Sequence, residues 1–205
     1  MVKRIFLVGF RATGKSTVGK ILAEKLNWSF MDMDFLISQQ AGEGVDVLTK
    51  NGSDWTKFRQ IEIEILGELS GLNDVVIGCG GGVGVNDIVE KNSNKTYGEL
   101  NKNILEKSED SVIILLSLDE GTIRDRLKIQ YKNKKIMPLL DENEAKNMKV
   151  DLDRDKMIEK QIEDSMNAYR KRKPLYEDLT SIKMSTDDLS PQEVVNNIME
   201  VIKNE

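Results

Sequence analysis

The feature that most constrains the fold is the segment Gly9–Ser16, GFRATGKS, which matches the pattern G-x-x-x-x-G-K-[S/T] in full. It follows a short apolar run, Ile5–Val8, and it precedes a segment from Lys15 to about Asn27 with apolar residues at helical spacing. In this strand–loop–helix setting, glycines let backbone N–H groups turn inward, and the start of the helix adds its positive dipole end. The alternative is a glycine-rich turn with a chance Lys-Ser pair, which the flanking elements disfavour. The segment therefore predicts a phosphate-binding loop.

The polar residues of this loop have predicted roles toward a nucleotide. Lys15 reaches the β- and γ-phosphates, and the Ser16 hydroxyl ligates Mg²⁺. The predicted nucleotide-binding residues are Arg11, Ala12, Thr13, Gly14, Lys15, Ser16 and Thr17. GTPases, motor proteins and kinases all use such a loop, so it predicts a nucleotide site without naming a reaction.

Apolar runs alternate with helical patterns along the chain. Strands are predicted at Ile5–Val8, Ser29–Met31, Val75–Ile77, Val112–Leu116 and Ile182–Met184. Helices are predicted at Lys15 to about Asn27, Phe58–Leu69, within the polar segment Asn86–Asp110, at about Glu120 to Lys128, and after the capping-box sequence Ser190–Glu193. Alternating strands and helices predict an α/β fold with a parallel sheet covered on both faces, whose ligands bind at the carboxyl ends of the strands.

Composition excludes several classes of protein. The length of 205 residues suits one domain, 1–205, and the net charge of −5 disfavours a general nucleic-acid binder. A single cysteine, Cys79, cannot form an internal disulfide; it is predicted to be buried rather than nucleophilic, and it favours a reducing, cytoplasmic compartment. The absence of histidine excludes a Ser-His-Asp triad and a His-ligated zinc site. No apolar run approaches the ~20 residues of a membrane span.

Two aspartates follow the second predicted strand. Asp32 and Asp34 are two residues apart, a spacing that places both carboxylates on one side of an extended segment. One could hold Mg²⁺ and the other could accept a hydrogen bond from a substrate hydroxyl, as kinase chemistry requires. The alternative is a pair of solvated loop aspartates.

Two arginines are candidates for holding an anion. Arg59 and Glu62 are one helical turn apart, so the carboxylate can fix the guanidinium as a carboxylate receptor, although a surface ion pair is the simpler reading. Arg172 lies at the basic end of a long predicted helix, where it either complements the helix terminus or completes an anion pocket with Arg59. Gly80–Gly82, after the third strand, is either a flexible turn or a place where the backbone meets a ligand.

Taken in order, these motifs resemble the shikimate kinase family. They are GFRATGKST at 9–17, the Asp32/Asp34 pair, the FRxxE of Phe58–Glu62, GGG at 80–82 and RKPLY at 172–176. The resemblance implies ATP- and Mg²⁺-dependent phosphorylation of the 3-hydroxyl of shikimate, in aromatic amino-acid biosynthesis. It also implies a three-layer P-loop kinase fold with a five-stranded parallel sheet and a lid, which we place at about 130–156.

The resemblance assigns roles to matching positions. Lys15 is a catalytic residue that binds phosphates, and Ser16 and Asp32 serve Mg²⁺. Asp34 contacts the shikimate hydroxyls and acts as the base.

For the substrate, the resemblance implies that Arg59 and Arg172 hold the carboxylate, with Gly81 and Gly82 against the ring. The implied partners are shikimate and ATP, with no nucleic acid or membrane, and the chain is expected to be a monomer.

One position departs from the family pattern. Met137 stands before Pro138-Leu139-Leu140, where the lid of the family usually carries an arginine. Such an arginine is worth orders of magnitude in rate when it stabilises a transferring phosphoryl group. Cations that could replace it are Arg11, Lys132, Lys134 and Lys135. The remaining alternatives are a kinase for another hydroxy acid such as gluconate, and a nucleotide-binding regulator without turnover.

Overall fold

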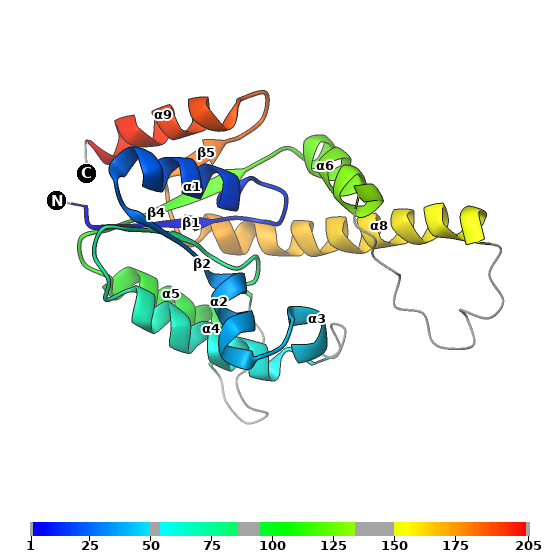
Figure 1. Cartoon of the computed structure of the whole chain (residues 1–205), viewed down its shortest axis with the longest axis horizontal. Helices are drawn as coiled ribbons and strands as arrows, with labels where there is room; N and C mark the ends of the chain where they lie inside the picture. Colours follow the sequence, from blue (N-terminus) through cyan, green and yellow to red (C-terminus); the bar gives the residue numbers. More distant parts are fainter. Residues whose placement is uncertain (1, 50–53, 86–94, 134–149, 204–205) are drawn as a thin grey trace.

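A computed structural model describes residues 2–49, 54–85, 95–133 and 150–203. Five strands form one sheet: β1 (Arg4–Val8), β2 (Ser29–Asp32), β3 (Val75–Gly78), β4 (Ser111–Ser117) and β5 (Lys183–Ser185). The helices are α1 (Lys15–Leu26), α2 (Met33–Ala41), α3 (Val45–Leu48), α4 (Thr56–Leu69), α5 (Tyr97–Lys107), α6 (Glu120–Asn133), α8 (Val150–Glu177) and α9 (Pro191–Ile202). Figure 1 shows the helices above and below the sheet.

All the strand pairs are parallel, and the order across the sheet is β2-β3-β1-β4-β5. The central strand β1 lies between β3 and β4, where Phe6 is in register with Ile77 on one side and Ile113 on the other. The predicted fold class, an α/β protein with a five-stranded parallel sheet, is therefore confirmed.

The two faces of the sheet bury separate apolar clusters. Ile5 and Leu7 pack with residues of α1 and α9, whereas Phe6 and Val8 pack with residues of α4, α5, α6 and α8. Successive strand residues point to opposite faces, so a strand covered on both sides is a continuous apolar run. This explains why the short apolar runs of the sequence were good predictors of the strands.

The helix caps follow local sequence signals. Ser190 caps α9 in the predicted capping box with Glu193, and Thr96 and Glu99 form a second capping box at α5. Two elements were not predicted: α2, which starts directly after β2, and the short α3.

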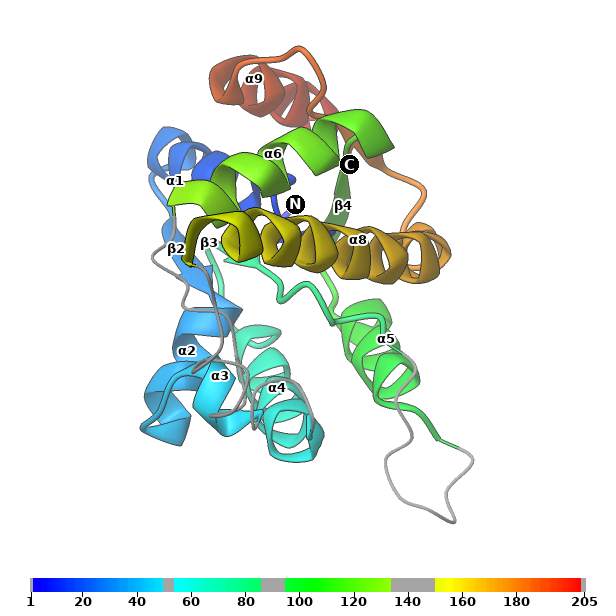
Figure 2. The same ribbon diagram turned by 90° about the vertical axis from the view of Figure 1, so that its right-hand side faces the viewer.

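The segment predicted to be a lid falls partly outside the described residues. Residues 130–133 form the last turn of α6, and 150–156 form the first turns of α8, which runs beside α6 (Figure 2). Met137, Lys134 and Lys135 lie outside the described residues, and Lys132 is exposed at the end of α6.

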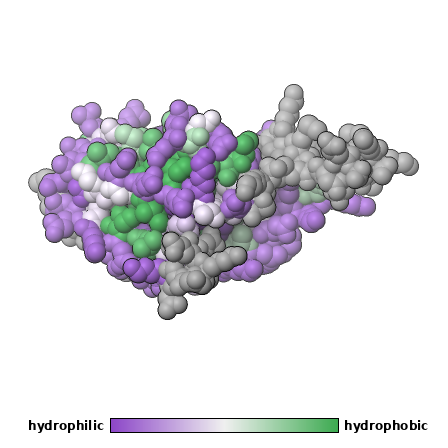
Figure 3. Space-filling model, turned by 90° about the horizontal axis from the view of Figure 1, so that it is seen from below, coloured by the Kyte–Doolittle hydropathy of each residue, from purple (hydrophilic) through white to green (hydrophobic). Residues whose placement is uncertain are grey.

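No helix in the described part of the chain is long and apolar enough to cross a membrane. Seen from below, where α4 and α5 lie, the molecule presents an area of hydrophobic residues bordered by hydrophilic ones (Figure 3).

Candidate active site

Two adjoining cavities lie at the carboxyl ends of β1, β2 and β3. One, the loop cavity, has a volume of about 550 Å³ and is lined by the phosphate-binding loop together with Asp32. The other, the arginine cavity, has a volume of about 410 Å³ and is lined by Arg59, Arg172 and neighbouring residues. Arg11 and Asp34 line both cavities. The structure thus brings the residues predicted from distant motifs to one place.

The phosphate-binding loop has the backbone geometry of an anion site. Gly14, at φ 92°, precedes α1 without a side-chain cap, and the first helical bond runs from Val18 N–H to the Gly14 carbonyl at 2.8 Å. The N–H groups of residues 15–17 therefore face away from the helix body and are available to an anion. Gly9, at φ 141°, is required for another reason: a Cβ there would lie 2.4 Å from the carbonyl oxygen of Leu116.

Lys15 lies beneath this loop. Its Nζ donates hydrogen bonds to the carbonyl oxygens of Gly9 and Phe10, each at 2.8 Å. Burial lowers the pKa of Lys15 to about 8, while the negative charge of Asp34 opposes the shift. The lysine remains mostly protonated at neutral pH, and its charge is poorly screened by water.

Ser16 and Asp32 bring two side-chain oxygen groups together. The Ser16 hydroxyl donates to Asp32 Oδ2 at 2.8 Å, and both residues line the loop cavity. A hydroxyl and a carboxylate suit Mg²⁺, which commonly takes one or two protein ligands and completes its shell with phosphate and water. Among the described residues there is no cluster of three or more acidic, His or Cys side chains that could hold a metal.

The prediction that Asp32 and Asp34 lie on one side of an extended segment is wrong. The strand ends at Asp32, whose carboxylate caps α2 by accepting from the Phe35 N–H, so Asp34 lies in the first turn of a helix. Both carboxylates still reach the loop cavity, because the helix begins at its edge.

Asp34 lies between the loop and the arginines. Its Oδ1 would be 2.8 Å from a Cβ on Gly80, so the carboxylate rests against that glycine. Burial raises the pKa of Asp34, and the charge of Lys15 partly offsets this. A carboxylate with a raised pKa is a better proton acceptor.

Arg59 and Glu62 form a buried ion pair, so the interpretation of these two residues as a surface ion pair is wrong. Their side chains are 2 % and 0 % exposed, and Arg59 Nη1 lies 2.8 Å from Glu62 Oε2. The rings of Trp55 and Phe58 lie 5.3 Å and 5.4 Å from the Arg59 Cζ atom. The carboxylate and the rings fix the guanidinium at the wall of the arginine cavity.

The glycine turn fits around these arginines. A Cβ on Gly82 would lie 2.2 Å from Arg59 Nη1, so the guanidinium occupies the space that a larger residue would fill. The carbonyl oxygen of Gly81 accepts hydrogen bonds from Arg172 Nη1 at 2.9 Å and from the Tyr176 hydroxyl. Gly81 and Gly82 both line the arginine cavity, as the predicted substrate contacts require.

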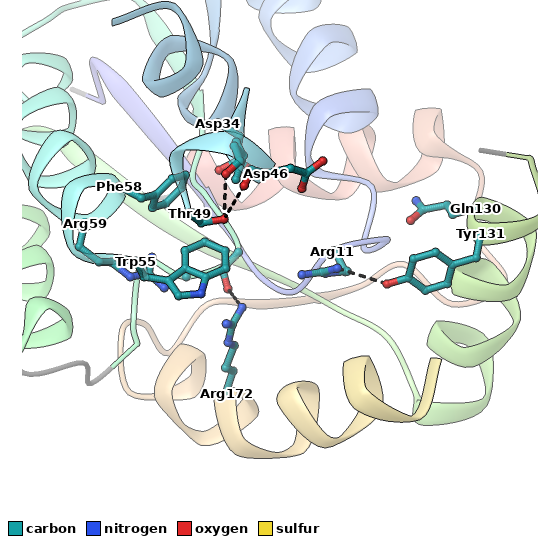
Figure 4. Close-up of a pocket in the computed structure, with 13 residues that line it drawn as sticks. Arg11, Asp34, Asp46, Thr49, Trp55, Phe58, Arg59, Gln130, Tyr131 and Arg172 are labelled. Carbon is teal, nitrogen blue, oxygen red and sulfur yellow. Dashed lines mark hydrogen bonds between the residues drawn. The ribbon is translucent and has the colours of Figure 1, made fainter. Parts of the chain in front are cut away.

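Arg172 is not at the end of its helix. The helix α8 continues through Pro174 to Glu177, and Arg172 reaches across to the glycine turn. The anion-pocket interpretation therefore fits better than a role at the helix terminus. Figure 4 shows Arg11, Arg59 and Arg172 coming from the loop, α4 and α8 toward the same cavity.

Cys79 is buried, as predicted. Burial raises its pKa, so the thiol stays protonated and is a poor nucleophile.

Sequence reasoning missed several residues around the cavities. Trp55 packs on Arg59, and its place just before the FRxxE motif was the available signal. Tyr131 accepts a hydrogen bond from Arg11 at 3.3 Å (Figure 4), and Arg126 donates to the carbonyl oxygen of Ala12 at 3.2 Å. Nothing in the local sequence distinguishes Tyr131 or Arg126 from other polar residues of α6.

Comparisons with known proteins point to one family. The sequence model of the shikimate kinase family matches residues 11–203. A shikimate kinase of Sulfurihydrogenibium sp. is 33 % identical over 203 residues, which cover 98 % of this chain and 99 % of the relative.

Solved structures show the same fold. Shikimate kinase from Acinetobacter baumannii in complex with shikimate superposes with a TM-score of 0.71 at 22 % identity, over 100 % of this chain and 94 % of that one. The enzyme from Aquifex aeolicus gives a TM-score of 0.64 at 25 % identity, over 98 % and 96 % of the two chains. Given the matches along nearly its whole length, this chain belongs to the shikimate kinase family.

Proposed function

We propose that the chain transfers the γ-phosphate of ATP to the 3-hydroxyl of shikimate, giving shikimate 3-phosphate and ADP. The observation that carries this proposal is that Asp34 and Arg11 line both cavities. A nucleotide bound at the loop and a carboxylic acid bound at the arginines would therefore both lie beside the Asp34 side chain. Phosphoryl transfer depends mainly on such positioning and on electrostatic stabilisation.

On the nucleotide side, the backbone N–H groups of the loop and the Lys15 ammonium bind the β- and γ-phosphates. Ser16 and Asp32, whose side-chain oxygens lie 2.8 Å apart, would hold Mg²⁺, and the bound ion would neutralise phosphate charge. Arg11 lies where the two cavities meet and can approach the transferring group.

On the acceptor side, Arg59 and Arg172 bind the shikimate carboxylate, and Gly81 and Gly82 contact the ring. Asp34 accepts the proton of the 3-hydroxyl as its oxygen forms a bond to the γ-phosphorus. The bond from that phosphorus to the β–γ bridging oxygen breaks, and ADP leaves.

The arrangement of the two cavities gives less support to the two alternative functions, a regulator without turnover and a kinase for another hydroxy acid. A regulator without turnover does not require Asp34 beside Lys15 at the junction of two cavities. A gluconate kinase would need a carboxylate site too, but the family match favours shikimate. We also propose that the chain acts as a monomer and that it works in the cytoplasm. The single buried cysteine supports the cytoplasmic assignment, because a chain that cannot form an internal disulfide suits a reducing compartment.

The experiment that tests the substrate assignment removes Arg172. We expect Arg172→Ala to raise the KM for shikimate by about 10- to 100-fold, since one charge-assisted hydrogen bond is lost, and to leave the KM for ATP unchanged. The matched control is Arg170→Ala, on the same helix, because Arg170 pairs with Glu120 at 2.8 Å outside both cavities. An unchanged KM for shikimate in Arg172→Ala would refute the assigned receptor.

A further inference from the structure

A buried amide lies behind the arginine cavity. Asn101 of α5 is 0 % exposed, although α5 contributes no residue to the lining of that cavity. Its Nδ2 donates to the carbonyl oxygen of Val83 at 3.0 Å and, more weakly, to Glu62 Oε2 at 3.5 Å. A polar side chain is costly to bury, so its hydrogen-bonding partners indicate what it holds in place.

The bond to Glu62 acts on the first arginine. The oxygen that faces Asn101, Oε2, is the same one that lies 2.8 Å from Arg59 Nη1. Glu62 is itself 0 % exposed, so protein groups rather than water determine how its carboxylate is oriented. A shift of that carboxylate would turn the Arg59 guanidinium.

The bond to Val83 acts on the second arginine. Val83 follows directly after Gly81 and Gly82 in the glycine turn. The Gly81 carbonyl accepts from Arg172, and Gly82 has its bare Cα against the Arg59 guanidinium. An anchor on the Val83 carbonyl therefore fixes the turn that both arginines touch.

We propose that Asn101 is a positioning residue for the carboxylate receptor. Its two N–H donors hold Glu62 and the glycine turn together, so Arg59 and Arg172 keep the spacing that one carboxylate needs. Both groups that face the amide are acceptors, which is why an amide donor suits this position and a carboxylate does not. The Asn101 Oδ1 has no hydrogen-bond partner among the described residues, so the contribution of this side chain comes from its donors. The inference rests on the proposed function.

The test replaces the donor without changing the size of the side chain. Asn101→Asp removes N–H groups and adds a charge beside Glu62, and we expect the KM for shikimate to rise about tenfold or more. The KM for ATP is expected to stay within about twofold of the wild-type value, because the loop cavity has no contact with Asn101. Asn103→Asp is the matched control: it makes the same change on the same helix at an exposed position, and it is expected to leave both KM values unchanged.

A second variant covers the case in which Asn101→Asp does not fold. Asn101→Ala removes the donors without adding charge, and it is expected to raise the KM for shikimate selectively, by about threefold to tenfold. If either folded variant kept the wild-type KM for shikimate, or raised both KM values in the same proportion while its Tm fell, the positioning role would be overturned. Turnover of shikimate by the wild-type protein is measured first, so a failure of the proposed function is distinguished from a failure of this inference.

Discussion

At the residue scale, the site depends on a few charged side chains whose surroundings change their chemistry. Asp34 is open to both cavities, yet burial raises its pKa. Lys15 is close enough to oppose that shift, so the two groups influence each other's charge. The proposed proton acceptor and the proposed phosphate-binding lysine are thereby placed side by side.

The role of Asp34 as a base predicts a loss of turnover in Asp34→Asn. An amide cannot accept the hydroxyl proton, so kcat is expected to fall by about 10²- to 10⁴-fold, with a smaller effect on the KM for ATP. Steady-state ADP release with shikimate measures this, and Asp125→Asn at an exposed position of α6 is the control. A kcat close to the wild-type value would show that another group takes the proton.

The lowered pKa of Lys15 predicts how nucleotide affinity depends on pH. Burial lowers this pKa to about 8, so the free protein loses the lysine charge as the pH rises through that value. The affinity for ATP is expected to be constant below about pH 7 and to weaken between about pH 7 and pH 9. Calorimetric titration with ATP and Mg²⁺ measures it. Lys15→Arg, which stays charged throughout this range, is expected to show no such dependence, and an equally flat wild-type profile would contradict the role of Lys15.

How well single residues could be predicted depended on whether their signal was local. Lys15 and Ser16 belong to a contiguous motif whose geometry follows from a few glycines. The burial of Arg59 could not be predicted, because its neighbours in space include the glycine turn. The sequence of α4 alone does not show that this turn packs against the guanidinium. Asn101 gave no signal for the same reason: its partners are 18 and 39 positions away.

At the element scale, connections between strands and helices bring the site together. The strand β2 passes directly into α2 at Asp32, and β3 passes into the glycine turn, so both polar segments start at the same edge of the sheet. The sheet order places β3 between β2 and β1, which brings these segments beside the phosphate-binding loop.

The close packing of the glycine turn predicts a sensitive position at Gly82. Gly82→Ala would place its methyl group 2.2 Å from Arg59 Nη1, and the guanidinium would have to move. The KM for shikimate is expected to rise about tenfold or more, with the KM for ATP unchanged. Gly84→Ala in the same turn is the control, since its methyl group would meet Leu175 at an ordinary 3.4 Å. Equal effects of the two substitutions would contradict the argument.

Strands could be predicted from the sequence where helices cover both faces of the sheet. The strands β1, β3 and β4 are short apolar runs because helices cover both faces of the sheet. The helix α2 was missed because it buries only Met33 and Ile37, which leaves little apolar periodicity to detect. The short α3 is a single turn, too brief for any periodic signal.

At the scale of the whole molecule, the fold places two cavities next to each other, with Asp34 and Arg11 lining both. One side of the arginine cavity is lined by Tyr131 of α6 and Arg172 of α8. Residues of α2, α3 and α4 line the other side. The single domain 1–205, the lid at about 130–156 and the monomeric state stay predictions. The expected effect of having Met137 where the family usually has an arginine also stays a prediction, because Met137 lies outside the described residues.

The central claim is that this chain phosphorylates shikimate. The most direct measurement is ADP release from ATP and Mg²⁺ in the presence of shikimate, of gluconate, or of no added acid. We expect ADP release to depend on shikimate, with release in the presence of gluconate no faster than without any added acid. Release that required gluconate, or no acceptor-dependent release from a protein that still binds ATP, would contradict it.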